Sequence, residues 1–326
     1  MTPLLSICIP THNRADTLLH TLNSILHQAT DAIEIVISDN HSDDNTRQIV
    51  KELQHRHHQI RYFQNSENIG YDRNLLNAVD RATGTFCWLM GSDDQVEPGA
   101  VAKILKTISD NPEITGITVN LNGYNKEMSE EIFVTRLPFA RDVQFRDWKE
   151  CFRTLFIYLG FISRQIIKKN YWNEALTTLN LDKICNSYIQ LYVLGKAIQL
   201  HPNWVYVDHP CVGWRSNNDS FLAEGFYRRF RIELEYLYAL NFLCQSESKL
   251  RTQISNQLIK SEFKNRIKTS LFHIKDSLTI KQIRKTSIEE FKSYYSFWTH
   301  LTPWLFIPRP ILFFLRNTHR ICKKFL

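Results

Sequence analysis

The chain has 326 residues, of which 43% are apolar and 22% are charged, so a substantial core is expected and an intrinsically disordered chain is excluded. The formal net charge is +7, and the segment from residue 281 to the end, with nine Lys or Arg and two Glu, carries all of it. The nearly neutral remainder argues against a general nucleic-acid-binding surface and indicates a basic tail.

Short apolar runs alternate with amphipathic segments over the first 90 residues. The runs are rich in strand formers, and the segments between them place apolar residues at helical spacing. Alternating strands and helices predict an α/β fold with a parallel sheet and right-handed crossovers. We expect strands over 4–9, 33–37, 60–63 and 86–90, with one helix in each interval.

Three residues are interpreted as helix boundaries in this region. Ser42 is expected to cap the second helix, whose first turn would then carry Asp43 and Asp44 beside the positive end of the helix dipole. Asp72 is expected to cap the third helix, and Gly84 to close it.

The pattern is less regular beyond residue 98. Up to residue 161 we expect a helix to residue 110, a strand over 114–121, an excursion or hairpin over 122–145 and an apolar segment over 148–161. Further on we expect helices at 166–169 and over 182–194, a strand over 204–207 and a polar loop over 214–220. Amphipathic helices are expected from residue 226 onward.

The loop after the first predicted strand excludes two cofactor classes. Residues 10–14 contain no glycine, so the G-x-G-x-x-G turn of nicotinamide- and flavin-dependent enzymes is missing, and there is no Walker-type loop. The seven cysteines form no CxxC pair, which favours reduced core thiols in a cytosolic protein over disulfides or zinc. We predict neither a signal peptide nor a membrane-spanning segment.

Polar side chains follow all four predicted strands in the connecting loops or at the start of the next helix. In a parallel sheet they would gather at one edge, where ligands bind, although each has a simpler alternative as a turn residue, a helix cap or a solvated side chain. The fourth strand ends in Gly91-Ser92-Asp93-Asp94, whose adjacent carboxylates would repel each other unless a cation lay beside them. The alternative is an acidic turn that leads into the next helix at Glu97-Pro98-Gly99. The polar residues concerned are Thr11, Asn13, Arg14, Asp39, Asn40, Asp72, Arg73, Asp93 and Asp94.

Four motifs in this region carry a family resemblance. They are Ser6-Ile7-Cys8-Ile9-Pro10-Thr11-His12-Asn13-Arg14, Ile37-Ser38-Asp39-Asn40, Asn68-Ile69-Gly70 with Arg73-Asn74, and Gly91-Ser92-Asp93-Asp94. In order and spacing over roughly the first 125 residues they resemble the family-2 nucleotide-sugar glycosyltransferases of the GT-A fold. A looser pattern that adds Cys87-Trp88 and ends in Asn217-Asn218-Asp219-Ser220-Phe221 is similar to bacterial abequosyltransferases, which transfer a 3,6-dideoxyhexose in O-antigen synthesis.

The resemblance implies a fold, two regions and a set of donor contacts. Residues 1–222 would form the GT-A nucleotide-sugar-binding and catalytic domain, with a mostly parallel sheet flanked by helices, and residues 223–326 a helical C-terminal extension. Asp39 would bond to the base, Arg73 would approach the base or ribose, and Asp93 would hold Mg or Mn against the diphosphate. The implied donor contacts are Pro10, Thr11, Asn13, Arg14, Asp39, Asn40, Asp72, Arg73, Ser92, Asp93 and Arg215.

The chain departs from the family pattern at two points. Gly91 occupies the first position of the D-x-D motif, which removes one usual contact to ribose or metal and leaves Asp94 as a second metal ligand beside Asp93. The carboxylate pair that supplies the general base in inverting members is also missing. Asp182 is the first candidate for the base and Asp219 the second, while Asp182 as a helix cap remains open, and Arg215 would lie over the diphosphate.

The tail combines aromatic and basic residues without any acid after Glu290. Such a segment is typical of one that lies on an anionic membrane surface, and the alternative is a helix that packs on the core of the protein. The expected partners are therefore a nucleotide-sugar donor, a glycan or polyprenyl-linked oligosaccharide acceptor, and the cytoplasmic face of the inner membrane. Two other hypotheses remain: a nucleotide-binding relative without activity, and a basic-tailed nucleic-acid-binding protein.

Overall fold

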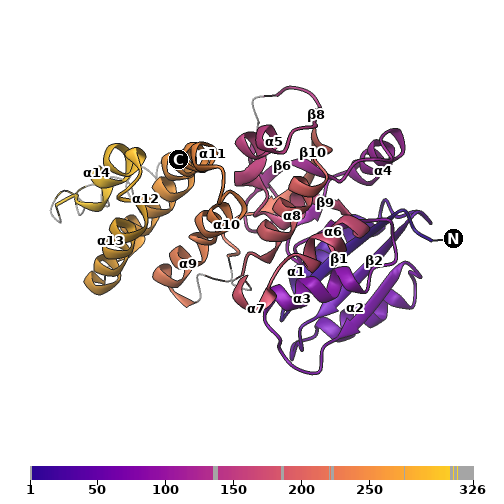
Figure 1. Cartoon of the computed structure of the whole chain (residues 1–326). Helices are drawn as coiled ribbons and strands as arrows, with labels where there is room; N and C mark the ends of the chain where they lie inside the picture. The colour runs from indigo at the N-terminus through magenta and orange to yellow at the C-terminus, as the bar shows by residue number, and fades with distance from the viewer. Residues whose placement is uncertain are drawn as a thin grey trace. The chain divides into compact units, whose positions relative to one another are not determined.

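The computed structural model (Figure 1) describes residues 2–134, 139–184, 187–219, 221, 224–274, 276–308, 311 and 314. The chain divides into two compact units, Met1–Asn218 and Asp219–Leu326. The boundary expected after residue 222, between the catalytic domain and the C-terminal extension, is drawn from sequence motifs and not from compactness, so it stays a prediction.

The first unit is built on one mixed sheet. Strands β3, β2, β1 and β4 are mutually parallel, as the alternating pattern predicts. Strand β9 then runs antiparallel between β4 and β6, so the order along the sheet is β3-β2-β1-β4-β9-β6-β10-β5, with β7 paired to β6 and β8 to β10. The strands are β1 Leu5–Thr11, β2 Ile33–Asp39, β3 Ile60–Gln64, β4 Phe86–Leu89, β5 Gln95–Val96, β6 Gly116–Tyr124, β7 Glu131–Val134, β8 Val143–Phe145, β9 Gln165–Lys168 and β10 Trp204–Arg215.

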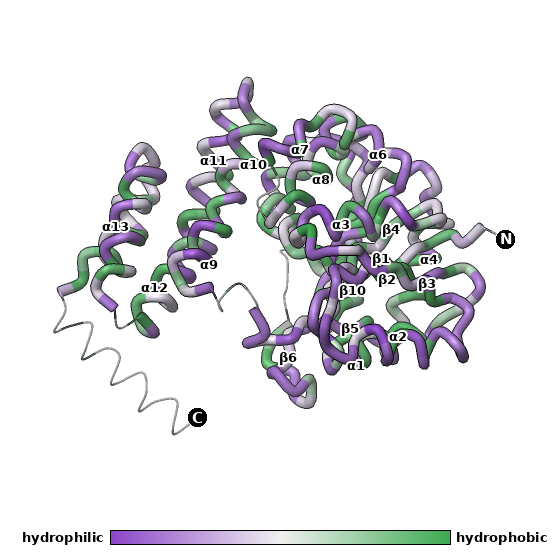
Figure 2. The backbone as a smooth tube through the Cα atoms, turned by 90° about the horizontal axis from the view of Figure 1, so that it is seen from below, coloured by the Kyte–Doolittle hydropathy of each residue, from purple (hydrophilic) through white to green (hydrophobic). Residues whose placement is uncertain are grey.

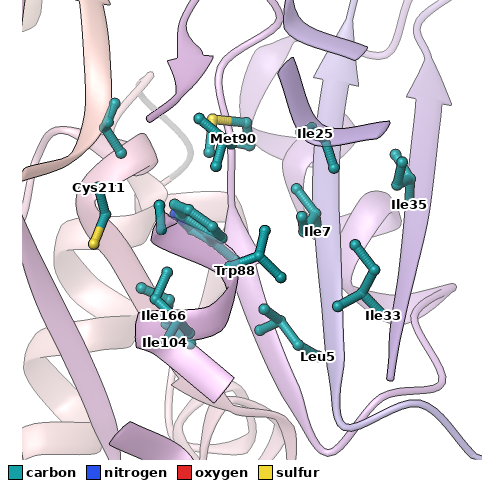
Figure 3. Close-up of a cluster of buried hydrophobic side chains, with 14 of the residues drawn as sticks. Leu5, Ile7, Ile25, Ile33, Ile35, Trp88, Met90, Ile104, Ile166 and Cys211 are labelled. Carbon is teal, nitrogen blue, oxygen red and sulfur yellow. The ribbon is translucent and has the colours of Figure 1, made fainter. Parts of the chain in front are cut away.

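Helices cover the sheet. One apolar cluster joins strand residues such as Ile7 and Trp88 to Ile25 of α1 and Ile104 of α4 (Figure 3). Helix α3 contacts β1 and β2 with residues outside that cluster, so it packs on the opposite face, because alternate strand residues point to opposite faces. The helices of this unit are α1 Ala15–Leu26, α2 Thr46–Gln54, α3 Tyr71–Asp80, α4 Ala100–Asp110, α5 Trp148–Leu155, α6 Lys169–Thr177, α7 Leu181–Ile184 and α8 Ile189–Leu200, with 3-10 turns at Phe156–Tyr158 and Ile162–Arg164.

Three predicted segments differ from the structure. The single helix expected over 182–194 is two helices, α7 Leu181–Ile184 and α8 Ile189–Leu200. The helix expected at 166–169 is strand β9, whose Ile166 and Ile167 are fully buried between β4 and β6. A short apolar run cannot be assigned from its periodicity alone, because a buried strand and a buried helix turn read alike. The strand expected at 204–207 continues as β10 to Arg215, so Trp214 and Arg215 belong to the sheet and not to a loop.

The three predicted helix boundaries are wrong. Helix α2 begins at Thr46, and Ser42 donates instead to the Asp39 carboxylate. Gly70 precedes α3, so Asp72 lies within its first turn. Gly84 lies beyond the end of α3 and packs against β1, where a Cβ would come within 2.5 Å of Ser6 Oγ. Each residue satisfies a tertiary requirement that the local pattern does not contain.

The second unit is helical (Figure 2). Its helices bury large aromatic side chains, among them Phe230, Phe263 and Phe291, and an ion pair at 2.6 Å joins Glu233 to Arg266. No helix in the described part of the chain is both long and apolar enough to cross a membrane. The elements are α9 Phe226–Glu233, α10 Glu235–Leu243, α11 Ser248–Leu258, a π-helix Ile259–Phe263, α12 Lys264–His273, α13 Ser277–Phe291, a π-helix Phe297–Leu301 and α14 Thr302–Leu305.

Candidate active site

The predicted gathering of polar groups is found at the carboxyl edge of β1, β2 and β4. Thr11 ends β1, Asp39 ends β2, and Asp93 comes shortly after β4. Because the three strands are parallel, their ends share one edge of the sheet. The Thr11 hydroxyl is buried there and takes no hydrogen bond from or to any described residue. A buried polar atom without a partner is costly, which makes Thr11 a candidate contact for a ligand.

The Asp93 carboxylate faces two cationic or donor groups. Its Oδ2 accepts a hydrogen bond from Asn218 Nδ2 at 2.7 Å and lies 3.9 Å from Arg14 Nη1. Arg14 Nη2 in turn donates to the Asn218 carbonyl at 3.5 Å. Burial raises the pKa of Asp93, while the Arg14 charge and the Asn218 bond act against that rise. The arrangement holds an oxygen donor beside positive charge at the sheet edge.

The Asp94 carboxylate is used inside the protein. Oδ2 accepts from Ser163 Oγ at 2.5 Å and Oδ1 from the Arg215 backbone N–H at 3.2 Å, while the Asp94 carbonyl accepts from Thr21 Oγ1 at 2.6 Å. Burial, followed by the charge of Asp93, raises the pKa of Asp94 to about 8. Asp94 therefore shapes the turn that presents Asp93.

Gly91, where the family pattern has an acid, lies against this turn. A Cβ at Gly91 would come 3.0 Å from Asp94 Oδ2, 3.1 Å from Asp93 Oδ1 and 3.2 Å from Ser163 Oγ. Its N–H donates to Ser163 Oγ at 2.9 Å. A side chain at this position would crowd both carboxylates, so glycine fits the observed packing.

The donor set fits a divalent cation that arrives with a substrate. Among the described residues no group of three or more His, Cys, Asp or Glu is placed to hold a metal. A quarter (26%) of the Asp93 side chain is exposed, and its hydrogen bond and ion pair both engage Oδ2. Hard cations such as Mg²⁺ bind through one or two carboxylates plus phosphate oxygens. Asp93 is better placed for this role than Asp94, both of whose oxygens are occupied.

Arg215 connects two parts of the edge. Its Nε donates to the Asp93 carbonyl at 2.9 Å, and its Nη1 donates to the Lys126 carbonyl at 2.5 Å in the turn between β6 and β7. Burial of the His20 ring lowers the pKa of His20, and the nearby positive charge of Arg215 lowers it further. Arg215 thus fixes the β6–β7 hairpin to the Asp93 turn.

Asp39 and Asn40 are held by many internal donors. Asp39 accepts from the Ser42 N–H at 2.9 Å, the Ser42 hydroxyl at 2.6 Å and the Tyr62 hydroxyl at 2.5 Å. Asn40 donates to Asn68 Oδ1 at 2.6 Å and accepts from Asn65 Nδ2 at 3.1 Å. A nucleotide base that forms a hydrogen bond with the Asp39 carboxylate would have to displace one of these donors.

The first turn of α3 is tied to the chain near α7 and α8. Asp72 accepts from the Ser187 N–H at 2.6 Å and the Ile189 N–H at 3.2 Å, so it caps α8. Arg73 forms an ion pair with Asp182 at 3.2 Å, and the Asp182 side chain is 87% exposed. Asp182 therefore lies at the same end of α3 as the candidate donor contacts, with its carboxylate in solvent.

We expect Asp72 to make folding depend on pH. Burial raises the pKa of Asp72 to about 6, against an ordinary value of 3.8. The folded state therefore binds this proton more tightly than the unfolded state, and its contribution to stability is full below pH 4 and is lost as the pH rises through 6. Denaturant unfolding should show that the parent loses about 2–3 kcal/mol more than Asp72→Asn between pH 4 and pH 7. An equal pH dependence in both proteins would contradict this assignment.

Four other predicted residues occupy separate places in the structure. Pro10 lies in β1 opposite Ser38, and Ser92 is buried in the Asp93 turn. Asn13 has a φ of 52° and its Oδ1 accepts from the Asp43 N–H at 2.9 Å. Asp219 belongs to the second unit, where its carboxylate pairs with Arg229 at 2.5 Å.

Three residues of the site were not among the predicted contacts. Asn218 belongs to the polar run 217–220 of the abequosyltransferase-like pattern, so that run was a usable signal. Tyr71 belongs to the site because it lies near the carboxylates of Asp72, Asp93 and Asp94. Burial raises the pKa of the Tyr71 phenol, and these negative charges add to the rise. No sequence pattern indicated Ser163, because it contacts Asp94 from about seventy residues further along the chain.

Comparison with known proteins adds a family assignment. The model of the family "Glycosyl transferase family 2" matches residues 6–166. Over 289 residues the chain is 30% identical to Abequosyltransferase RfbV of Salmonella typhimurium, an alignment that covers 79% of this chain and 80% of that protein. It is 34% identical over 105 residues to the GalNAc(5)-diNAcBac-PP-undecaprenol beta-1,3-glucosyltransferase of Campylobacter jejuni, covering 32% of this chain and 34% of that protein.

Solved structures show the same fold. The structure of S. aureus TarS 1-349 in complex with UDP-GlcNAc matches with a TM-score of 0.64 at 14% identity, over 89% of this chain and 82% of that one. At this identity the likeness concerns the fold, and it agrees with the expected GT-A architecture.

Proposed function

Because the chain belongs to glycosyl transferase family 2, we propose that it transfers a sugar from a nucleotide-sugar donor to a glycan acceptor with inversion at the anomeric carbon. The observation that carries this proposal is the convergence of Asp93, Arg14 and Asn218 near the unpartnered Thr11 hydroxyl at the edge formed by the carboxyl ends of the parallel strands β1, β2 and β4. That edge is where such sheets bind nucleotides.

In this proposal the residues around Asp93 stabilise the leaving nucleotide. A divalent cation, held by Asp93 and the donor diphosphate, would neutralise the charge that develops as the glycosidic bond breaks. Arg14, 22% exposed at its side chain, adds positive charge on the same side. Ser163 and the Arg215 N–H keep Asp94 in place, so the turn that carries Asp93 does not have to reorganise during the reaction.

The general base is proposed to be Asp182, with Asp219 as the second candidate. Asp182 is bonded to Arg73 through Oδ1, and its exposed side chain is free to turn toward an acceptor hydroxyl. Asp219 is less suited, because it is a quarter exposed and paired with Arg229 at 2.5 Å. A solvent-exposed carboxylate becomes a stronger base when a bound acceptor excludes water from its surroundings.

The substrates are proposed from the relatives. Similarity to an abequosyltransferase over four fifths of both chains supports a deoxyhexose donor, a 3,6-dideoxyhexose in particular, and a role in O-antigen or other surface polysaccharide synthesis. The name of the Campylobacter jejuni relative specifies an acceptor joined to undecaprenol through PP, which supports a polyprenyl-linked oligosaccharide as acceptor.

Thermal-shift measurement against UDP-, GDP-, CDP- and dTDP-sugars, with and without Mn²⁺, tests the proposal. Only a ligand that binds the folded state raises the melting temperature, so one base class should stabilise the protein, and more strongly with Mn²⁺. If no nucleotide sugar shifts the melting temperature under either condition, the proposed function is wrong.

We also propose that the second unit rests on the cytoplasmic face of the inner membrane. Its described surface exposes Tyr295 (73%), Trp298 (59%) and Phe306 (52%), near the exposed cations Lys285 and Lys292 in sequence. Aromatic and basic residues together favour an anionic lipid interface. The basic residues Arg309, Arg316, Arg320, Lys323 and Lys324 lie outside the described residues.

Vesicle co-sedimentation will measure this association. We expect the protein to bind vesicles that contain anionic lipid and not neutral ones, less so at high salt, and Tyr295→Ser with Trp298→Ser to weaken binding about tenfold. Phe242→Ser, which alters another exposed aromatic residue of the same unit, is the matched control. Equal binding to neutral vesicles, or affinity for DNA or RNA instead, would favour the alternatives.

A further inference from the structure

Three neighbouring strands of the first unit meet at a glycine. In the sheet, Phe133 of β7 and Trp214 of β10 both lie opposite Gly123 of β6. Residues paired across strands project from the same face, so the side chains on either side of Gly123 share one face of the sheet. The glycine leaves the position between them without a side chain.

The two aromatic rings fill that position. Their centroids are 5.7 Å apart with an interplanar angle of 49°, and a Cβ on Gly123 would come within 2.5 Å of Phe133 Cζ. Trp214 packs against the apolar core below, while Phe133 remains 42% exposed. The result is an aromatic platform, Phe133 with Trp214, whose inner ring is supported and whose outer ring is open to solvent.

The platform is attached to the candidate donor site by Arg215, the residue after Trp214. Arg215 bonds to the Asp93 carbonyl and to the Lys126 carbonyl in the turn of the same hairpin. The Ser216 N–H donates to the Tyr124 carbonyl at 3.0 Å, which extends the pairing of β10 and β6 beyond the rings. The hairpin therefore presents the platform at the edge of the sheet where Asp93 lies.

We propose that the platform binds a pyranose ring of the acceptor glycan. A pyranose with axial C–H groups on one face offers an apolar surface of aromatic size, while its hydroxyls stay at the rim and remain hydrated. A supported, half-exposed ring next to the reacting centre suits that shape. This inference rests on the proposed function, because it assigns the acceptor to a surface beside the proposed donor site.

Saturation-transfer NMR with methyl glycosides of glucose, galactose, mannose and rhamnose tests the platform without knowledge of the true acceptor. In the parent, the C–H protons of one ring face should receive the strongest saturation from the protein. Phe133→Ala should remove that pattern and weaken binding about fivefold to tenfold. The donor-induced rise in melting temperature and the slow hydrolysis of donor by water should stay as in the parent.

Two further variants separate stacking from a general effect. Ile132→Ala, on the same strand with 49% exposure and on the opposite face, should bind the glycosides like the parent. Gly123→Ala keeps the Phe133 ring but displaces it, so it should weaken glycoside binding as Phe133→Ala does. Glycoside saturation that is unchanged in Phe133→Ala, or lost equally in Ile132→Ala, or undetectable in a parent that still binds donor, would overturn the inference. A parent that binds no donor would instead contradict the proposed function.

Discussion

If the proposed function holds, an Asp93→Asn variant will transfer sugar roughly 10²–10³-fold more slowly than the parent, because the proposed metal-assisted departure of the nucleotide would contribute several kcal/mol to the reaction. The amide keeps the shape of the side chain but loses the negative charge that faces Arg14 at 3.9 Å and that is proposed to bind the cation. Initial rates with the donor identified by thermal shift, measured over a range of Mn²⁺ concentrations, will give both the rate loss and the change in metal dependence.

Asp110→Asn is the matched control for this change. It neutralises an exposed carboxylate that pairs with Lys106 on α4 at 2.8 Å, so its transfer rate should equal that of the parent. A transfer rate in Asp93→Asn within a few-fold of the parent would show that the cation, if any, is held elsewhere. A parent that binds donor but transfers nothing would favour a non-catalytic relative.

A Trp88→Ala variant will lose about 3–5 kcal/mol of free energy of unfolding. Trp88 is fully buried in the core between the sheet and the helices (Figure 3), and its Nε1 donates to the Ser163 carbonyl at 2.7 Å. The change therefore leaves a large cavity and also an unpaired carbonyl beside the residue that holds Asp94. Since domains of this kind are stable by only about 5–15 kcal/mol, the loss is a large part of the total.

Two further substitutions of tryptophan separate these contributions in denaturant unfolding. Trp88→Phe keeps most of the apolar volume but removes the donor, so it should cost about 1–3 kcal/mol. Trp298→Ala changes a side chain that is 59% exposed and should cost less than about 1 kcal/mol. If Trp88→Ala were no more costly than Trp298→Ala, the core packing assigned to Trp88 would be wrong.

Local sequence patterns are sufficient to predict part of this fold. The alternation of apolar runs and amphipathic segments was sufficient for β1 to β4 and the helices between them. The strand ends could then be placed, because parallel strands deliver their carboxyl ends to a common edge. Thr11, Asp39 and Asp93 lie at that edge as expected, although their roles with a ligand stay predictions.

Local patterns do not predict the role of a residue that contacts a distant part of the chain. Asp72 reads as a cap of its own helix, yet its carboxylate caps α8 more than a hundred residues later. Gly84 reads as the end of α3, yet it allows β1 to pass closely. In both cases the local signal is the same for either partner, and only the packing selects one.

The sequence by itself determined the α/β architecture, the family and the edge at which the carboxylates gather, because periodicity and strand ends are local properties of the chain. Only the tertiary structure decided that Asp94 is turned inward to Ser163 while Asp93 faces Arg14 and Asn218 through Oδ2, and that Phe133 and Trp214 meet over Gly123. The physical reason is that burial, hydrogen-bond partners and ring contacts depend on which distant segments pack together.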